Sequence, residues 1–221
     1  LVNINKGLPT NYHFVLMFQA ERTILVKHQD FAYKDITSID DVEWVYLSSM
    51  GSHTEDLHIK LGEYLNQHPR IKLGFNPGTF QMQLPIEKVK DIYRNTYVLF
   101  INTEEAQRIL KTEESDVQKL FPMVHALGPK VVVMTDGPAG AYASDGASQY
   151  FMPSYPDPKP PISRTGAGDA FATGFMGALM SGLSIEQALT WAPIESMSVV
   201  QGVGAQKCLL TKDQLLEYLK Q

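Results

Sequence analysis

Residues 164–171 form the stretch that decides the fold, with the sequence Arg-Thr-Gly-Ala-Gly-Asp-Ala-Phe. It is a turn of small residues at the start of a long helical pattern. Glycine at Gly166 and Gly168 lets the backbone approach a ligand closely, and the N–H groups of a helix's first turn favour an anion there. Asp169 lies in the same turn, where its carboxylate can accept a proton from a hydroxyl that attacks a nearby phosphate. The stretch therefore predicts an anion site with a candidate base beside it.

A purely structural interpretation of this stretch is equally open. Thr165 would then be the N-cap of the helix, the glycines would allow tight packing, and Asp169 would complement the helix dipole. Short glycine motifs are weak evidence when they stand alone. The choice between the two interpretations depends on the rest of the chain.

Short apolar runs alternate with amphipathic stretches from residue 42 onward, which is typical of repeated β-α units on a parallel sheet. The expected strands are residues 42–47, 71–75, 97–101 and 130–134. The expected helices are residues 55–67, 87–93, 104–111, 115–126, 166–181, 185–200 and 212–220. The proline-rich segment 153–161 predicts an extended loop. The chain is thus expected to be an α/β protein with a mostly parallel sheet.

The N-terminal region has a different character. Residues 12–19 and 23–28 are rich in aromatic and β-branched residues and are separated by a short polar break, which predicts a β-hairpin.

Three polar motifs follow predicted strands. Asn102 and Glu105 have the spacing of a capping box, and in isolation this interpretation is preferred. A functional interpretation would require a metal–nucleotide complex in front of the carboxyl end of the strand, where open α/β sheets bind ligands. Residues 135–140, Thr-Asp-Gly-Pro-Ala-Gly, form a glycine-bearing turn, for which a hairpin connection is the simplest account. Residues 76–78, Asn-Pro-Gly, are by themselves just a turn.

Charge and hydropathy exclude several classes of partner. The net charge is −5, and no run of basic residues is present to neutralise a phosphate backbone, so nucleic acid is a poor candidate. No apolar stretch is long enough to span a bilayer, and the first residues do not have the pattern of a signal peptide. A cytoplasmic protein that does not contact membranes is therefore expected.

The order of these motifs along the chain resembles that of the PfkB or ribokinase family. A hairpin is followed by the motifs at residues 76–78, 102–105, 135–140 and 166–169, and by Gly-Ala-Gln at residues 204–206. The resemblance implies a ribokinase-like three-layer fold. Residues 1–34 would be part of a small β-sheet lid, and residues 35–221 would be the nucleotide-binding and catalytic domain.

The resemblance also implies roles for individual residues. Asp169 would deprotonate the acceptor hydroxyl, and the backbone of Gly166, Ala167 and Gly168 would stabilise charge on the transferring phosphoryl group. Asn102 and Glu105 would help to place Mg²⁺ and the nucleotide phosphates. The residues implied to bind ATP are Asn102, Thr135, Asp136, Gly137, Pro138, Ala139, Gly140 and Gly168. Residues 193–204 would wall the adenine pocket.

The implied activity is ATP-dependent phosphorylation of a hydroxymethyl group on a sugar. The alternatives are adenosine or another nucleoside as acceptor, and a non-catalytic nucleotide-binding remnant. A dinucleotide-binding oxidoreductase is a weaker interpretation, because no early strand leads into a Gly-x-Gly-x-x-Gly turn. A homodimer formed through the lid is also consistent with the resemblance.

Two features depart from the family pattern. Ser163 stands where family members often have Asp, at a position associated with a monovalent cation, so potassium activation is not expected here. The family's first strands and its Gly-Gly segment have no counterpart before Leu1, so the sequence is expected to be incomplete at its N-terminus.

Overall fold

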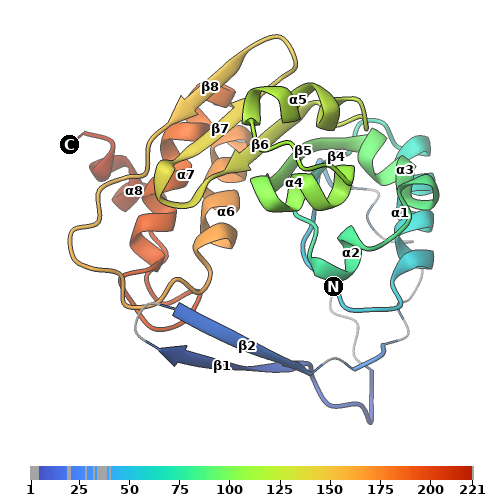
Figure 1. The fold of residues 1–221 in the computed structure, drawn as a ribbon, viewed down its shortest axis with the longest axis horizontal. Helices are drawn as coiled ribbons and strands as arrows, with labels where there is room; N and C mark the ends of the chain where they lie inside the picture. Colours follow the sequence, from blue (N-terminus) through green and yellow to red (C-terminus); the bar gives the residue numbers. More distant parts are fainter. Residues whose placement is uncertain are drawn as a thin grey trace. The chain divides into compact units, whose positions relative to one another are not determined.

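The computed structural model describes residues 5–18, 21–27, 29–31, 33, 39 and 41–220 (Figure 1). Residues 19, 20 and 28, which fall in the predicted hairpin, lie outside these ranges. Contacts divide the chain into two units, Leu1–Leu16 with Thr23–Val132 and Met17–Arg22 with Val133–Gln221.

The predicted hairpin is confirmed. Strands β1 (Tyr12–Phe18) and β2 (Glu21–Lys27) form a two-stranded sheet. The Tyr12 ring lies edge-on to the Phe14 ring at 5.5 Å between centroids, and the Lys27 ammonium lies 5.2 Å from the Tyr12 ring centroid. The two aromatic rings on one face of the hairpin thus pack against each other, and the Tyr12 ring also forms a cation–π contact with Lys27.

The first unit contains a parallel three-strand segment. Strands β3 (Trp44–Leu47), β4 (Lys72–Phe75) and β5 (Thr96–Asn102) pair in parallel. In the strand order of the sheet, β3-β4-β5 is followed by β6 (Val131–Thr135), β7 (Ala141–Ser144) and β8 (Gln149–Met152). Leu73 and Leu99 are fully buried, as expected for strands that are covered on both faces. The predicted parallel β-α pattern is therefore confirmed, with strand ends shifted by one or two residues.

The described residues of the first unit form five helices: α1 (Glu55–Gln67), α2 (Thr79–Met82), α3 (Ile86–Asn95), α4 (Thr103–Leu110) and α5 (Val117–His125). Helix α1 has the predicted bounds. It packs closely on α3 at Gly62, where a Cβ atom would lie 2.8 Å from the Cβ of Asp91. Helix α2 was not predicted, because its four residues are too few to show a helical period.

The second unit contains the end of β6 (Val131–Thr135), the short 3₁₀ helix η1 (Gly137–Ala139) and the antiparallel pair β7 (Ala141–Ser144) and β8 (Gln149–Met152). Its helices are α6 (Ala167–Met180), α7 (Ile185–Val199) and α8 (Lys212–Tyr218). The two helices predicted over residues 166–200 are confirmed.

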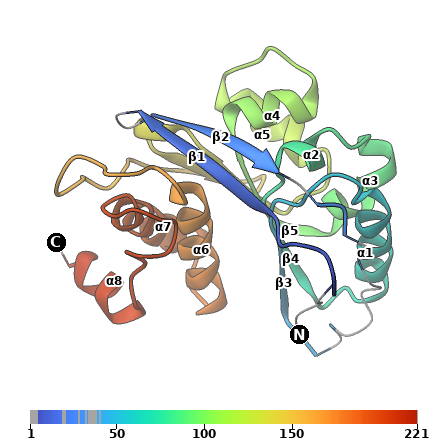
Figure 2. The same cartoon turned by 90° about the horizontal axis from the view of Figure 1, so that it is seen from below.

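Helices α6 and α7 lie side by side (Figure 2). Their close approach depends on small residues: a Cβ atom at Gly174 would lie 3.0 Å from the Cγ of Glu195 and 3.2 Å from the Cα of Ala192. Phe175 and Leu189 are buried. The close packing of α6 on α7 makes the helix pair rigid, and so holds the start of α6 in a fixed position.

No helix in the described ranges has both the length and the apolar character that crossing a membrane would require.

Candidate active site

The start of α6 is built by a glycine and not by a capping side chain. Gly166 is the N-cap, with φ 86°, and no side chain accepts a hydrogen bond at this cap. The interpretation of Thr165 as N-cap is therefore wrong: its N–H donates to Ser163 Oγ at 3.3 Å, outside the helix. Residue 166 has a left-handed backbone conformation, which glycine adopts readily and which is unfavourable for residues with a Cβ atom such as threonine.

The first turn of α6 offers free hydrogen-bond donors. The first helical bond runs from Ala170 N–H to the Gly166 carbonyl at 2.8 Å, and Ala167 N–H donates to the Arg164 carbonyl at 3.3 Å. Across the described ranges, nothing accepts a hydrogen bond from the N–H of Gly168 or Asp169. Both residues are exposed. Unpaired N–H groups at a helix N-terminus are the chemistry that binds a phosphate.

Gly166 also lies against a second segment of the chain. A Cβ atom at this position would come within 2.7 Å of the Cβ of Ala205. The motif at residues 204–206, which resembles the C-terminal pattern of the family, therefore packs on the start of α6. Two independent constraints, the positive φ and this contact, require glycine at position 166.

The Asp169 carboxylate is exposed in the first turn of α6, and its main-chain carbonyl accepts a hydrogen bond from Thr173 Oγ1 at 2.7 Å. No described residue forms an ion pair or hydrogen bond with the carboxylate itself. It is thus free to meet a substrate hydroxyl, as a general base must be.

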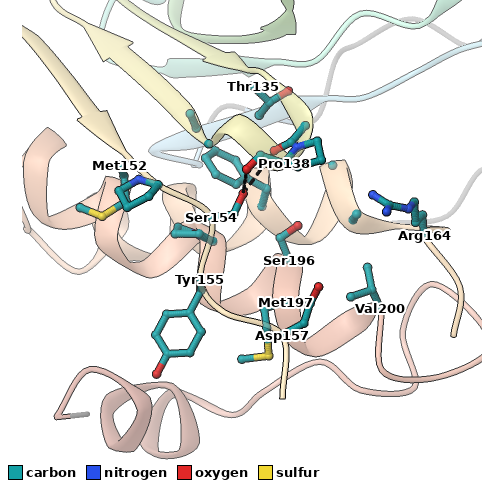
Figure 3. Close-up of a pocket in the computed structure, with 18 of the residues that line it drawn as sticks. Thr135, Pro138, Met152, Ser154, Tyr155, Asp157, Arg164, Ser196, Met197 and Val200 are labelled. Carbon is teal, nitrogen blue, oxygen red and sulfur yellow. Dashed lines mark hydrogen bonds between the residues drawn. The ribbon is translucent and has the colours of Figure 1, made fainter. Parts of the chain in front are cut away.

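A cavity of about 290 Å³ opens beside the start of α6 (Figure 3). Its walls include five residues that the sequence predicts to bind the nucleotide, two predicted to stabilise the phosphoryl group, of which Gly168 belongs to both sets, and four from the segment predicted to wall the adenine pocket. These are Thr135, Gly137, Pro138, Gly140, Ala167, Gly168, Pro193, Ser196, Met197 and Val200. Asp136, Ala139, Gly166 and Asp169 do not line it.

The turn after β6 forms one wall of this cavity. Asp136 N–H donates to the Gly140 carbonyl at 2.9 Å, which closes the turn. Ser154 Oγ donates to the carbonyls of Gly137 and Pro138 at 3.3 and 3.1 Å (Figure 3). Gly140 has φ 119°, and a Cβ atom there would overlap the Met152 carbonyl oxygen. The turn is therefore fixed from two sides.

Several wall residues were not predicted from the sequence: Ser154, Tyr155, Asp157, Arg164 and Phe171. Phe171, on α6, is buried. Ser154, Tyr155 and Asp157 lie in the proline-rich loop, whose composition predicts an extended path but not the surface that it covers.

Asn102 and Glu105 form a capping box in the first unit. Asn102 Oδ1 accepts from Glu105 N–H at 2.8 Å, and Asn102 N–H donates to Glu105 Oε2 at 2.8 Å. Burial raises the pKa of the Glu105 carboxyl. Glu105 Oε1 has no partner in the described part of the chain, and the neighbouring Thr103 Oγ1 is buried without one. A carboxylate oxygen thus stays available, which fits Mg²⁺ because this ion keeps much of its water shell.

A buried polar network in the first unit was also not predicted. Gln81 Oε1 accepts from Met50 N–H and Gly78 N–H at 3.0 and 2.8 Å, and Gln81 Nε2 donates to the Ser48 carbonyl at 3.1 Å and to His58 Nε2 at 2.9 Å. His58 Nδ1 donates to a backbone carbonyl at 2.6 Å. Burial lowers the pKa of His58, which favours the neutral ring that this pattern requires. The network fixes the loop that follows β3.

The Gln81→Leu variant is expected to lower the free energy of unfolding by about 2–4 kcal/mol, because leucine leaves several buried groups without partners. Urea unfolding followed by circular dichroism measures this. Gln83→Leu is the matched control, since Gln83 is exposed close to α2, and it is expected to change stability by less than about 0.5 kcal/mol. Equal effects of the two variants would show that the network does not stabilise the fold.

Comparison with known proteins shows the family to which the chain belongs. The model of the pfkB family carbohydrate kinases matches residues 1–212. A cytidine kinase from Thermococcus kodakarensis is 32% identical over 121 residues, which cover 53% of this chain and 42% of that protein. A ribokinase from Bacillus subtilis is 34% identical over 115 residues, which cover 50% of this chain and 39% of that protein. The chain thus matches about two fifths of the length of these relatives.

The fold agrees with these matches. A solved structure of Arabidopsis thaliana ribokinase, complexed with ribose and ATP, matches this fold with a TM-score of 0.78 at 19% sequence identity. The match covers 96% of this chain and 70% of the ribokinase chain. The predicted ribokinase-like α/β fold with a mostly parallel sheet is therefore confirmed.

Proposed function

Because the chain belongs to the pfkB family of carbohydrate kinases, we propose that it transfers the γ-phosphoryl group of ATP to a hydroxymethyl group of a sugar. The observation that carries the proposal is the first turn of α6. There an exposed carboxylate, Asp169, lies beside unpaired N–H groups at the edge of a cavity. A kinase needs this combination of anion site and base.

The cavity beside α6 is the proposed nucleotide pocket. The turn at residues 135–140 and the wall from α7 would enclose the adenosine part, and Gly168 N–H would donate to the phosphates. The side chain of Asp136 and the residue Ala139 do not line the cavity, so their proposed role is to shape the turn. ATP is the proposed donor, consistent with the ATP bound in the Arabidopsis ribokinase structure.

Mg²⁺ is the proposed second cofactor, and Asn102 and Glu105 are the residues proposed to orient it through water. When bound, the ion would neutralise charge on the nucleotide phosphates. The carboxylate oxygen that the capping box leaves free supports this role for Glu105.

Asp169 is proposed to accept the proton of the attacking hydroxyl. Proton transfer late in a loose, in-line transition state suits a carboxylate base, and positioning of the reactants supplies most of the rate. The backbone of Gly166, Ala167 and Gly168 would hold the transferring phosphoryl group.

The β1–β2 hairpin is proposed to belong to a lid, residues 1–34, that closes over the acceptor and excludes water, with residues 35–221 as the catalytic domain. The exposed Phe14 and Leu16 on β1 are consistent with a homodimer formed through this hairpin. The proposed location of the enzyme is the cytoplasm, where ATP is available.

A nucleoside such as cytidine or adenosine is the second candidate acceptor. The match to a cytidine kinase at 32% identity favours it. Because the chain covers only part of its relatives, the acceptor is tested directly. The purified chain is incubated with labelled ATP, Mg²⁺ and a panel of pentoses, hexoses and nucleosides, and labelled product is separated from ATP.

Phosphorylation of a sugar, absent in an Asp169→Asn variant, would support the proposal, and phosphorylation only of nucleosides would establish the alternative. Nucleotide binding without transfer to any acceptor would indicate a non-catalytic remnant.

A further inference from the structure

Arg164 is a positive charge in the wall of the cavity beside α6. Among the lining residues that the structure describes, it is the only cation, and Asp157 is the only anion. Figure 3 shows the Arg164 side chain at the right of the view, to one side of Pro138, Ser154 and Ser196. The side chain is exposed, and within the described ranges it forms no ion pair or hydrogen bond. Its guanidinium is thus available to a ligand.

The backbone holds Arg164 next to the proposed phosphate site. Its carbonyl accepts from Ala167 N–H at 3.3 Å, which ties residue 164 to the first turn of α6. The same cavity wall includes Ala167 and Gly168. A guanidinium presents several N–H donors in a planar fork, which matches the oxygen atoms of a phosphate better than a lysine does.

We infer that Arg164 binds the polyphosphate chain of the nucleotide and acts together with the N–H groups that begin α6. This inference rests on the proposed function, because it takes the cavity as the nucleotide pocket. It assigns a role to a side chain outside the motifs on which the family resemblance depends. Arg164 contributes to the recognition of phosphates and leaves the recognition of adenosine to the apolar walls, among them Pro193 and Met197.

The experiment compares the binding of ADP with that of adenosine, by isothermal titration calorimetry with the full chain. In Arg164→Ala the affinity for ADP is expected to fall by about tenfold or more, because charge-assisted hydrogen bonds are lost. The affinity for adenosine is expected to stay within about twofold, since no phosphate is present. Arg164→Lys is expected to be intermediate, because it keeps the charge without the fork.

Lys90→Ala is the matched control. Lys90 is exposed on α3, so this variant removes one positive charge far along the sequence from the site. It is expected to bind ADP like the wild type, and circular dichroism checks that all variants are folded.

The results separate the two proposals. Unchanged affinity of Arg164→Ala for ADP, or an equal loss for ADP and adenosine, would overturn the role of Arg164 and leave the proposed function intact. A wild-type chain that binds neither ADP nor ATP would overturn the proposed nucleotide pocket, and with it this inference.

Discussion

The Asp169→Asn variant is expected to lose phosphoryl transfer by about 10²–10⁴-fold, the range that a general base contributes. Asparagine keeps the size of the side chain and can still lie in the first turn of α6, but it cannot accept the proton of the attacking hydroxyl. Because the carboxylate has no partner among the described residues, its removal breaks no contact of the fold. The affinity for ATP is therefore expected to stay close to that of the wild type, measured by titration calorimetry beside steady-state kinetics.

Asp213→Asn provides the control for this variant. Asp213 is likewise an acidic residue in the first turn of a helix, α8, so its replacement removes the same helix-dipole interaction without touching the candidate site. It is expected to leave turnover unchanged. Near-normal turnover in Asp169→Asn would refute the assignment of the base and would return Asp169 to the structural interpretation, as a residue that only complements the dipole.

The main elements of the fold could be predicted because their signals are local. The bounds of α1 agree with the prediction residue for residue, and those of α7 agree within one residue, since both have long amphipathic or apolar periods. Helix α2 was missed because it has only four residues and follows a sequence typical of a turn. The N-cap at Thr165 was wrong because the left-handed backbone of Gly166 replaces a side-chain cap.

The candidate site could be predicted only in part, for a physical reason. The glycine turn and the 135–140 segment are continuous motifs, so their ligand chemistry can be inferred from neighbouring residues. By contrast, Ser154 donates a hydrogen bond to the Gly137 carbonyl, 17 positions away in the sequence. Gln81 forms a hydrogen bond with His58, 23 positions away. Arg164 lies within residues 164–171, but its sequence position does not show that it lines the same cavity as the turn after β6. Contacts of this kind depend on tertiary structure and leave no periodic signal.

The Gly166→Ala variant is expected to lose both stability and activity. Alanine at φ 86° is strained, and its Cβ would lie 2.7 Å from the Cβ of Ala205. The strain predicts a loss of about 1–3 kcal/mol in the free energy of unfolding. Relief of the contact would shift the first turn of α6, and displacement of the phosphate donors there predicts a fall in kcat of about 10²–10³-fold. Chemical denaturation and kinetics with saturating ATP measure the two effects.

Two further variants separate the causes. Gly177→Ala lies on the same helix with open space around its Cβ position, so it is expected to be neutral or to stabilise the protein by up to about 1 kcal/mol. The double variant Gly166→Ala, Ala205→Gly removes the Cβ–Cβ contact but keeps the backbone strain and the 2.8 Å approach to the Cα of residue 205, so it is expected to recover only a part of the activity through a favourable coupling. If the double variant recovers nothing, the side chain of Ala205 does not set the geometry of the phosphate site. If Gly166→Ala behaves like Gly177→Ala, the first turn of α6 is not the rigid anion site on which the kinase mechanism depends.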